Sequence, residues 1–241
     1  MMGALLEIKD FKGAYQPDQN PIVAGSNLTL RRGVISGLIG GNGAGKTTLI
    51  RGISGILEHF EFASAFYDGA PIDLESREFK SQRITVFTED RSFPHWSFRE
   101  YMAFVLRSYR LTAAEDRLDS LIKGFNFHDH LNTPLGNLSS GNAKKARLIA
   151  AFMLPVPLII LDEPVDALDF LGTEFLYSCI FQAKSEQRAV LMSSHIAESL
   201  TKLSDELYVL QHGVLTGPEV VPQTAEGLRQ LLDTSTPSER P

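Results

Sequence analysis

The 241-residue sequence has little cysteine, no long apolar run and no excess of positive charge. Its one cysteine, Cys179, excludes an intrachain disulfide framework and favours a reducing compartment. The longest apolar run, residues 148–161, contains two prolines and is shorter than the about 20 residues that a membrane-spanning helix needs. A net charge of −6 disfavours a strongly cationic nucleic-acid binder, so nucleic acid is not an expected partner.

The first ten residues, MMGALLEIKD, have no basic segment ahead of an apolar one, so we expect no signal peptide. We therefore expect a soluble, cytosolic protein that does not cross a membrane alone. The polar, proline-containing segment 233–241 is expected to be a disordered tail.

Hydrophobic periodicity predicts an α/β fold. Alternating apolar residues predict half-buried strands at residues 5–11 and 27–30, and residues 34–39 form a β-branched run that leads into glycines. From Thr48 onward the apolar spacing becomes helical. This order of strand, glycine loop and helix is the order of a phosphate-binding βα unit.

The middle of the chain predicts a helical insertion, over about residues 91–155. Ser97 and Glu100 form a capping-box pattern, and further amphipathic helices are expected at 111–123 and 141–154. Strand patterns return afterwards, and the last of them is followed by a hairpin turn. We expect these strands at residues 158–161, 189–193 and 206–210, within one domain that spans residues 1–232.

Residues 40–47, GGNGAGKT, fit the phosphate-loop pattern G-x-x-x-x-G-K-[ST] in full. Glycines let backbone N–H groups surround phosphate oxygens, and the positive end of the following helix points at them. Lys46 would reach the β- and γ-phosphates, and the Thr47 hydroxyl would coordinate Mg²⁺. A glycine-rich turn with an incidental lysine is the alternative, which the flanking strand and helix disfavour. The candidate nucleotide-binding residues here are Gly40, Asn42, Gly43, Ala44, Gly45, Lys46, Thr47 and Thr48.

Residues 158–163, LIILDE, form an apolar strand that ends in two carboxylates. Asp162 is suited to hold magnesium through water, and Glu163 to polarise an attacking water. The alternative is a buried strand whose acidic end caps the next element. The phosphate loop upstream favours the chemical interpretation.

Between these motifs lies the segment 138–142, LSSGN, which opens a basic helix containing Lys144, Lys145 and Arg147. A turn of small residues at a helix start is a second candidate anion site. An ordinary N-cap by Ser139 or Ser140 is the alternative. The position of the segment, just before strand 158–161, favours the anion site.

Together these motifs resemble the ATP-binding-cassette (ABC) ATPases over residues 6 to about 215. LSSGN resembles the family signature LSGGQ, residues 166–169 (DALD) resemble the D-loop, and His195 resembles the switch histidine. Tyr15 matches the aromatic residue that stacks on adenine, and residues 84–89 fall where the family has its Q-loop. The resemblance implies a P-loop NTPase of the ABC ATPase fold, with a RecA-like core, an N-terminal antiparallel β subdomain and a helical signature subdomain.

The resemblance also implies roles for particular residues. Catalysis would be carried by Lys46, Glu163 and His195, and Mg²⁺ would be held by Thr47, Glu89 and Asp162. Two copies would enclose two ATP molecules head to tail, with the phosphate loop of one facing the signature and D-loop of the other. The residues assigned to that second face are Ser139, Gly141 and Asp169.

Several of these assignments have structural alternatives. His195 could cap a helix, and Tyr15 could pack in the core. The aromatic residues Phe93, Trp96 and Phe98 could be core as well, but the resemblance makes their region the groove for a membrane partner.

The sequence departs from the family pattern at three positions. Glu89 replaces the usual glutamine, as in the branch that resembles ABC-2-type exporters, and adds a negative charge near the γ-phosphate. Ser140 replaces a glycine, which would cost roughly 1 kcal/mol if that residue needs a positive φ. Asn142 is one methylene shorter than glutamine. Because Lys46 and Glu163 are retained, we expect an active ATPase, though a slow one.

The resemblance therefore implies the ATPase subunit of an exporter at the cytoplasmic face of the cell membrane. It would dimerise on ATP, as a homodimer or with a related cassette, and drive a separate transmembrane permease. A peptide, drug or lipid is the expected cargo. The alternatives are a soluble, non-transport ABC ATPase and a nucleotide-dependent assembly subunit with little hydrolysis. The net charge disfavours the first, and Glu163 with His195 disfavours the second. A simple P-loop kinase would not explain LSSGN and DALD.

Overall fold

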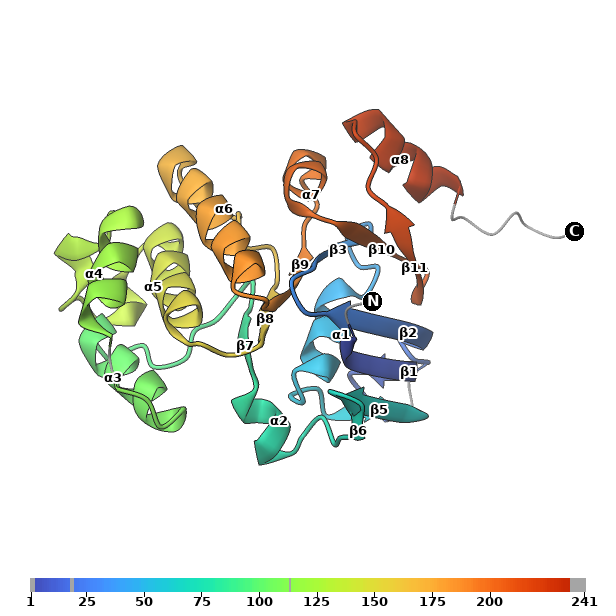
Figure 1. The fold of residues 1–241 in the computed structure, drawn as a ribbon, viewed down its shortest axis with the longest axis horizontal. Helices are drawn as coiled ribbons and strands as arrows, with labels where there is room; N and C mark the ends of the chain where they lie inside the picture. Colours follow the sequence, from blue (N-terminus) through green and yellow to red (C-terminus); the bar gives the residue numbers. More distant parts are fainter. Residues whose placement is uncertain (1–2, 18–19, 113, 235–241) are drawn as a thin grey trace, which may run out of the picture.

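The computed structural model describes residues 3–17, 20–112 and 114–234, and it contains two β-sheets with helices around them (Figure 1). The smaller sheet is antiparallel and has the order β2-β1-β5-β6, with β4 also paired to β1. It comprises β1 (Ala4–Ala14), β2 (Val23–Arg31), β4 (His59–Glu61), β5 (Ser64–Tyr67) and β6 (Ala70–Pro71).

The second sheet has the strand order β11-β10-β3-β9-β8-β7. All neighbours in it are parallel except β11, which pairs antiparallel with β10. Every residue of β3, β8 and β9 is buried, as expected for parallel strands covered on both faces. The strands are β3 (Ile35–Ile39), β7 (Arg83–Val86), β8 (Leu158–Leu161), β9 (Ala189–Ser193), β10 (Glu206–Gln211) and β11 (Val214–Val220).

The helices divide into two groups. Three of them lie between β7 and β8 in the chain and gather at the end of the molecule remote from the antiparallel sheet (Figure 1): α3 (Phe98–Ser108), α4 (Glu115–Gly124) and α5 (Ser140–Met153). The others are α1 (Lys46–Ile53), α2 (Arg77–Ser81), α6 (Phe170–Ser185), α7 (Ala197–Leu203) and α8 (Ala225–Thr234). None of the helices within the described residues is both long and apolar enough to span a membrane.

Helix α1 positions the site because it is packed between the two sheets. Its Leu49, Ile50 and Ile53 are buried in one cluster with Phe11 of β1 and Leu38 of β3. Burying an aliphatic side chain contributes roughly 1.5–3 kcal/mol relative to leaving it exposed. The apolar face of α1 thereby fixes the loop between β3 and α1 at the carboxyl end of β3.

The predicted capping box is confirmed, but one predicted helix has different bounds. The Ser97 capping box is present, because Glu100 N donates to Ser97 Oγ and Ser97 N donates to Glu100 Oε2 at 2.8 Å. The helix predicted at 111–123 is too long, since α4 begins only at Glu115. Arg110 closes the preceding turn in the left-handed region, with φ 57°.

The C-terminal prediction is partly wrong. Helix α8 includes Asp233 and Thr234, which were assigned to the expected tail, and residues 235–241 lie outside the described residues. Helices α2, α6 and α8 and the short strands β4 to β6 have no counterpart among the predicted elements.

Candidate functional site

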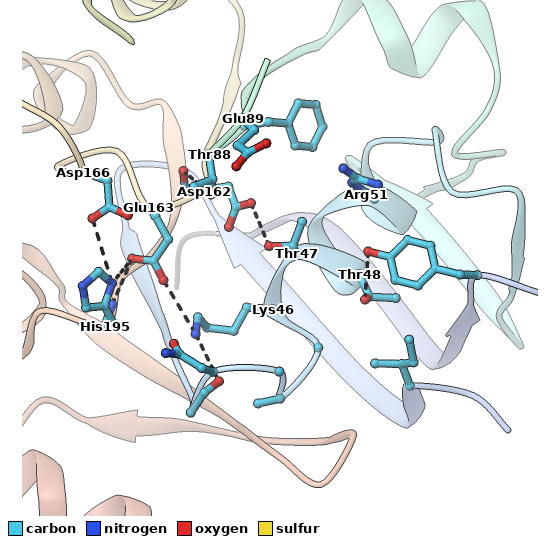
Figure 2. Close-up of a pocket in the computed structure, with 18 residues that line it drawn as sticks. Lys46, Thr47, Thr48, Arg51, Thr88, Glu89, Asp162, Glu163, Asp166 and His195 are labelled. Atoms are coloured by element: carbon cyan, nitrogen blue, oxygen red, sulfur yellow. Dashed lines mark hydrogen bonds and ion pairs between the residues drawn. The ribbon is translucent and has the colours of Figure 1, made fainter. Parts of the chain in front are cut away.

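The carboxyl ends of β3, β8 and β9 and the start of α1 meet at a cavity of about 690 Å³ (Figure 2). Parallel strands end at the same edge of their sheet, so residues far apart in sequence are brought together there. The cavity is lined by Tyr15, Ile22, Gly41, Asn42, Gly43, Ala44, Gly45, Lys46, Thr47, Thr48, Arg51, Phe87, Thr88, Glu89, Asp162, Glu163, Asp166 and His195.

The lysine of the phosphate loop is buried rather than exposed to solvent. Lys46 is 8% exposed, and its Nζ donates to the carbonyl oxygens of Gly40 at 2.8 Å and Gly41 at 3.4 Å. The N-cap of α1 is Gly45, in the left-handed region with φ 106°, and no side chain caps the helix. A Cβ at Gly45 would lie 2.9 Å from Val23 Cγ2. The first N–H groups of α1 are therefore left to an anion, which this end of a helix attracts.

Asp162 is fully buried at the end of β8, and both of its carboxylate oxygens accept hydrogen bonds. Thr47 Oγ1 donates to Oδ2 at 3.0 Å, and Ser193 Oγ donates to Oδ1 at 2.8 Å. The Thr88 hydroxyl donates to the backbone oxygen of Asp162 at 3.2 Å. Carboxylate and hydroxyl oxygens are the hard ligands that Mg²⁺ takes, so Thr47 and Asp162 fit that ion.

Glu163 lies between a lysine and a histidine (Figure 2). Its Oε1 is 3.6 Å from Lys46 Nζ, and its Oε2 accepts from the backbone N–H of His195 at 3.0 Å. The ring Nδ1 of His195 is 2.9 Å from the same Oε2. The backbone of Glu163 is in the left-handed region, with φ 47°, and its N–H donates to Ser193 Oγ at 2.9 Å. Such strained residues cluster at functional sites, where the surroundings fix them.

Two predicted residues lie at the rim of the cavity. Tyr15 is 44% exposed, so it does not pack in the core; Thr48 Oγ1 donates to its hydroxyl at 3.4 Å, and the Arg51 guanidinium lies 5.8 Å from its ring centre. The side chain of Glu89 is 80% exposed and lies 3.9 Å from the guanidinium of Arg91.

Four predicted nucleotide-binding residues are absent from the cavity lining: Gly40, whose carbonyl oxygen accepts from Lys46 Nζ, and the three residues assigned to the face of a second copy. Ser139 is the N-cap of α5 and accepts from the backbone N–H of Asn142 at 3.2 Å. Asp169 caps α6, and the Lys145 ammonium donates to it at 2.6 Å. Gly141 lies in the first turn of α5. Within this chain Ser139, Gly141 and Asp169 therefore lie at the starts of helices. The nucleotide role proposed for these three residues requires a second copy.

The signature departures have structural consequences. Ser140 is the first residue of α5 and does not have a positive φ, so the strain considered for serine is not incurred. Asn142 Nδ2 lies 2.9 Å from His130 Nε2, so its amide is bound within the chain.

Some lining residues are not among the candidate site residues predicted from sequence, namely Ile22, Gly41, Arg51, Phe87, Thr88 and Asp166. Arg51 follows Thr47 by four positions and therefore lies on the same face of α1. This spacing could have identified Arg51 as a lining residue from the sequence. Asp166 belongs to the DALD motif, and its Oδ1 lies 3.9 Å from His195 Nδ1.

Comparison with known proteins agrees with this geometry. Residues 23–166 match the family model described as ABC transporter. The chain belongs to that family. Its ABC cassette is 30% identical over 216 residues to the putative ABC transporter ATP-binding protein AlbC of Bacillus subtilis (strain 168), covering 87% of this chain and 89% of AlbC. It is 28% identical to the cobalt import ATP-binding protein CbiO of Salmonella paratyphi A (strain ATCC 9150 / SARB42), covering 87% of this chain and 78% of that protein.

Among solved structures, the ATP-binding subunit of an ABC transporter superposes on this cassette with a TM-score of 0.82. That structure is 25% identical and covers 96% of this chain and 95% of its own. The α/β P-loop fold expected for an ABC ATPase is confirmed. The chain is the ATP-binding subunit of an ABC transporter, an ATPase.

Proposed function

We propose that this cassette hydrolyses Mg²⁺–ATP as a dimer and drives export of a peptide, drug or lipid through a separate membrane subunit. The observation that carries the catalytic part is the position of Glu163, held by His195 on one oxygen and facing Lys46 with the other. A carboxylate held in this place can accept a proton from an attacking water.

The candidate residues of the cavity then have the following roles. Lys46 and the free N–H groups of α1 bind the phosphates, Tyr15 stacks on the adenine, and Thr47, Asp162 and Glu89 hold Mg²⁺ directly or through water. The metal, when bound, neutralises phosphate charge. Glu163 accepts a proton from the attacking water, and His195 keeps the Glu163 carboxylate in place. A general base of this kind contributes typically 10²–10⁴-fold in rate.

The metal assignment is tested with Thr47→Val, which removes the hydroxyl and keeps the β-branched shape. We expect turnover to fall and the Mg²⁺ concentration for half-maximal ATP hydrolysis to rise about tenfold or more, because one ligand is lost. Thr216→Val, an exposed exchange on β11, is the matched control and should leave both quantities unchanged. Equal metal dependence in the Thr47 variant and the wild type would remove Thr47 from the metal site.

The dimer is supported by residues beside the D-loop. Phe170 and Leu171 directly follow Asp169, and they are 77% and 74% exposed. Adjacent large apolar side chains on a surface favour a protein interface. A second cassette in the head-to-tail arrangement would bring its nucleotide to Ser139 and Gly141. The partner is a second copy of this chain or a related cassette.

The membrane partner is assigned to an aromatic patch formed by Phe93, Trp96 and Phe104. The ring centre of Phe93 lies 4.6 Å from that of Trp96 and 5.1 Å from that of Phe104. The side chain of Phe104 is 41% exposed. Phe98 does not belong to this patch. It is 1% exposed and packs edge-on against Phe127, so for Phe98 the core alternative is correct.

The proposed direction of transport rests on Glu89 within the segment TEDRSF, which resembles the exporter branch. One relative, in contrast, is named for cobalt import, so the direction needs a transport assay. Affinity purification of the tagged cassette from a detergent extract should retain a membrane protein, as expected for a cassette bound to a permease at the cytoplasmic face of the membrane. Inside-out vesicles that contain the pair should accumulate cargo when ATP is added outside. Uptake only into right-side-out vesicles loaded with ATP would reverse the proposed direction.

A further inference from the structure

Helix α5 buries three basic side chains, Lys144, Lys145 and Arg147, each 5% exposed. Burying a cation costs several kcal/mol unless charges and hydrogen bonds compensate. The partner of Lys145 is the D-loop residue Asp169. The other two cations bind the segment 87–92, on either side of Glu89.

Arg147 binds the part of this segment that follows Glu89. Its Nε donates to Asp90 Oδ2 at 2.7 Å, and one terminal nitrogen donates to the carbonyl oxygens of Asp90 at 3.2 Å and Ser92 at 3.0 Å. The guanidinium also lies over the ring of Tyr101, 5.1 Å from its centre. The Asp90 carboxylate therefore pairs with the guanidinium.

Lys144 binds the part that precedes Glu89. Its Nζ lies 3.1 Å from the carbonyl oxygen of Phe87, 3.2 Å from that of Thr88 and 3.4 Å from that of Glu163. An ammonium has three donors, and these three carbonyls match them. Within the described ranges no carboxylate oxygen lies at ion-pair distance from Lys144. This side chain therefore joins the backbone of segment 87–88 to the backbone of the proposed catalytic base.

Glu89 itself has only a weak contact of its own. Its side chain is 80% exposed, and its ion pair with Arg91 is long and exposed too. An exposed pair of this kind contributes about 0–1 kcal/mol and does not fix a side chain. A carboxylate at this rim also faces repulsion from the phosphates. The backbone on both sides of it, in contrast, is bound to α5.

We propose that Lys144 and Arg147 are positioning residues that hold Glu89 toward the metal, so that helix α5 sets the place of this carboxylate. This inference rests on the proposed metal role of Glu89. Because α5 begins at Ser140, the same helix carries the signature segment that would face a second cassette.

The test compares Arg147→Met, which keeps the side chain's length and removes its charge and donors, with Arg117→Met. Arg117 is the matched control, because it donates to the carbonyl oxygen of Phe152 at 3.1 Å and pairs with Glu186, away from segment 87–92. The companion variants are Lys144→Gln, Glu89→Ala and the double variant of Arg147 and Glu89. Asp90→Asn combined with Arg147→Met avoids an unpaired carboxylate if the single variant folds poorly.

The first readout is amide hydrogen exchange of the nucleotide-free chain. Arg147→Met and Lys144→Gln should speed exchange in peptides covering residues 87–92 by about tenfold, which is the loss of roughly 1.4 kcal/mol of local stability. Peptides covering β8 should be unchanged, and Arg117→Met should leave residues 87–92 protected. Unchanged protection of this segment in the Arg147 and Lys144 variants would overturn the proposal.

The second readout is the Mg²⁺ concentration for half-maximal ATP hydrolysis. Arg147→Met and Glu89→Ala should each raise it about tenfold, within the range seen when a ligand's support is lost, and the double variant should match Glu89→Ala. Additive effects would show that Arg147 acts independently of Glu89. An unchanged metal dependence in Glu89→Ala would show that Glu89 does not help to bind the metal, so that Arg147 has no metal ligand to position. Either result overturns the inference. A wild-type chain without any ATPase activity would instead overturn the proposed function, and hydrogen exchange would still report on the contacts of α5.

Discussion

The carbonyl oxygen of Ala167 lies where a side chain at Gly141 would begin: a Cβ at position 141 would stand less than 3.0 Å from it. Ala167 is itself in the left-handed region, with φ 65°. The signature glycine thus allows the first turn of α5 to pack directly against the D-loop of the same chain. This contact gives Gly141 a structural role that does not depend on a second cassette.

Gly141→Ala should therefore destabilise the isolated chain. Overpacking of this kind costs typically 1–3 kcal/mol, and the better helix propensity of alanine offsets less than that. Urea unfolding measures the change. Gly3→Ala is the control, because a Cβ there meets nothing within 4 Å. Unchanged stability with lost ATPase activity would assign Gly141 to the second-copy interface alone.

The sequence predicted the elements whose signals are local. The phosphate loop and the Ser97 capping box are contiguous patterns, and the runs at 158–161 and 189–193 are continuous apolar strands. Their positions follow from residues close together in the chain. The parallel order β3-β9-β8 then places the ends of these strands at one edge, which is why Asp162, Ser193 and Thr47 meet.

The contacts of α5 were not predictable in the same way. Lys144 and Arg147 look in the sequence like the solvated side of an amphipathic helix. Their partners lie up to 57 positions away, in a segment with no regular secondary structure. Only the folded packing shows that Arg147 meets Asp90.

Lys46→Ala should abolish ATP binding and turnover while the chain stays folded. The ammonium supplies the positive charge for the phosphates, and its other partners are two backbone carbonyls of the same loop and the Glu163 carboxylate, 3.6 Å away. A ligand at 100 times its Kd stabilises a protein by about 2.7 kcal/mol, so the wild type should melt at a higher temperature with ATP and the variant should not. Lys12→Ala, at an exposed lysine of β1, is the control. Phosphate release at the wild-type rate would show that the loop is assigned wrongly.

Trp96→Ala and Phe104→Ala should weaken assembly with the membrane subunit and leave ATP binding nearly unchanged. These side chains contact each other at the surface, with ring centres 5.4 Å apart. Phe98→Ala is the contrast, because it removes a buried ring and should cost roughly 3–5 kcal/mol of stability. Co-purification and thermal melting separate the two effects. A core-sized loss of stability in the Trp96 or Phe104 variant would reassign the patch to packing.

Cys179 should resist alkylation in the folded chain. Burial raises the pKa of its thiol to about 12, so at pH 8 almost none is the reactive thiolate. Iodoacetamide at pH 8 should therefore modify the chain only after urea unfolds it, as mass spectrometry would show. Because the folded pKa lies above the ordinary value of 9.0, the stability that this thiol contributes is complete below about pH 9 and is lost as the pH rises from there toward 12. Rapid labelling of the native chain would contradict the burial of this thiol.

Glu163→Gln should separate ATP binding from ATP hydrolysis. The amide keeps the shape of the side chain but cannot accept a proton from water, and Lys46, Thr47 and Asp162 remain to hold nucleotide and metal. We expect turnover to fall at least about a hundredfold, while ATP still raises the melting temperature. Because the nucleotide is not hydrolysed, a closed dimer should accumulate. The variant should therefore elute earlier from size-exclusion chromatography with ATP than without it. Glu58→Gln, the same exchange at an exposed glutamate, should behave like the wild type. Unchanged turnover would exclude Glu163 as the base, whereas slow turnover without an ATP-dependent dimer would keep the chemistry and point to a related cassette as the partner.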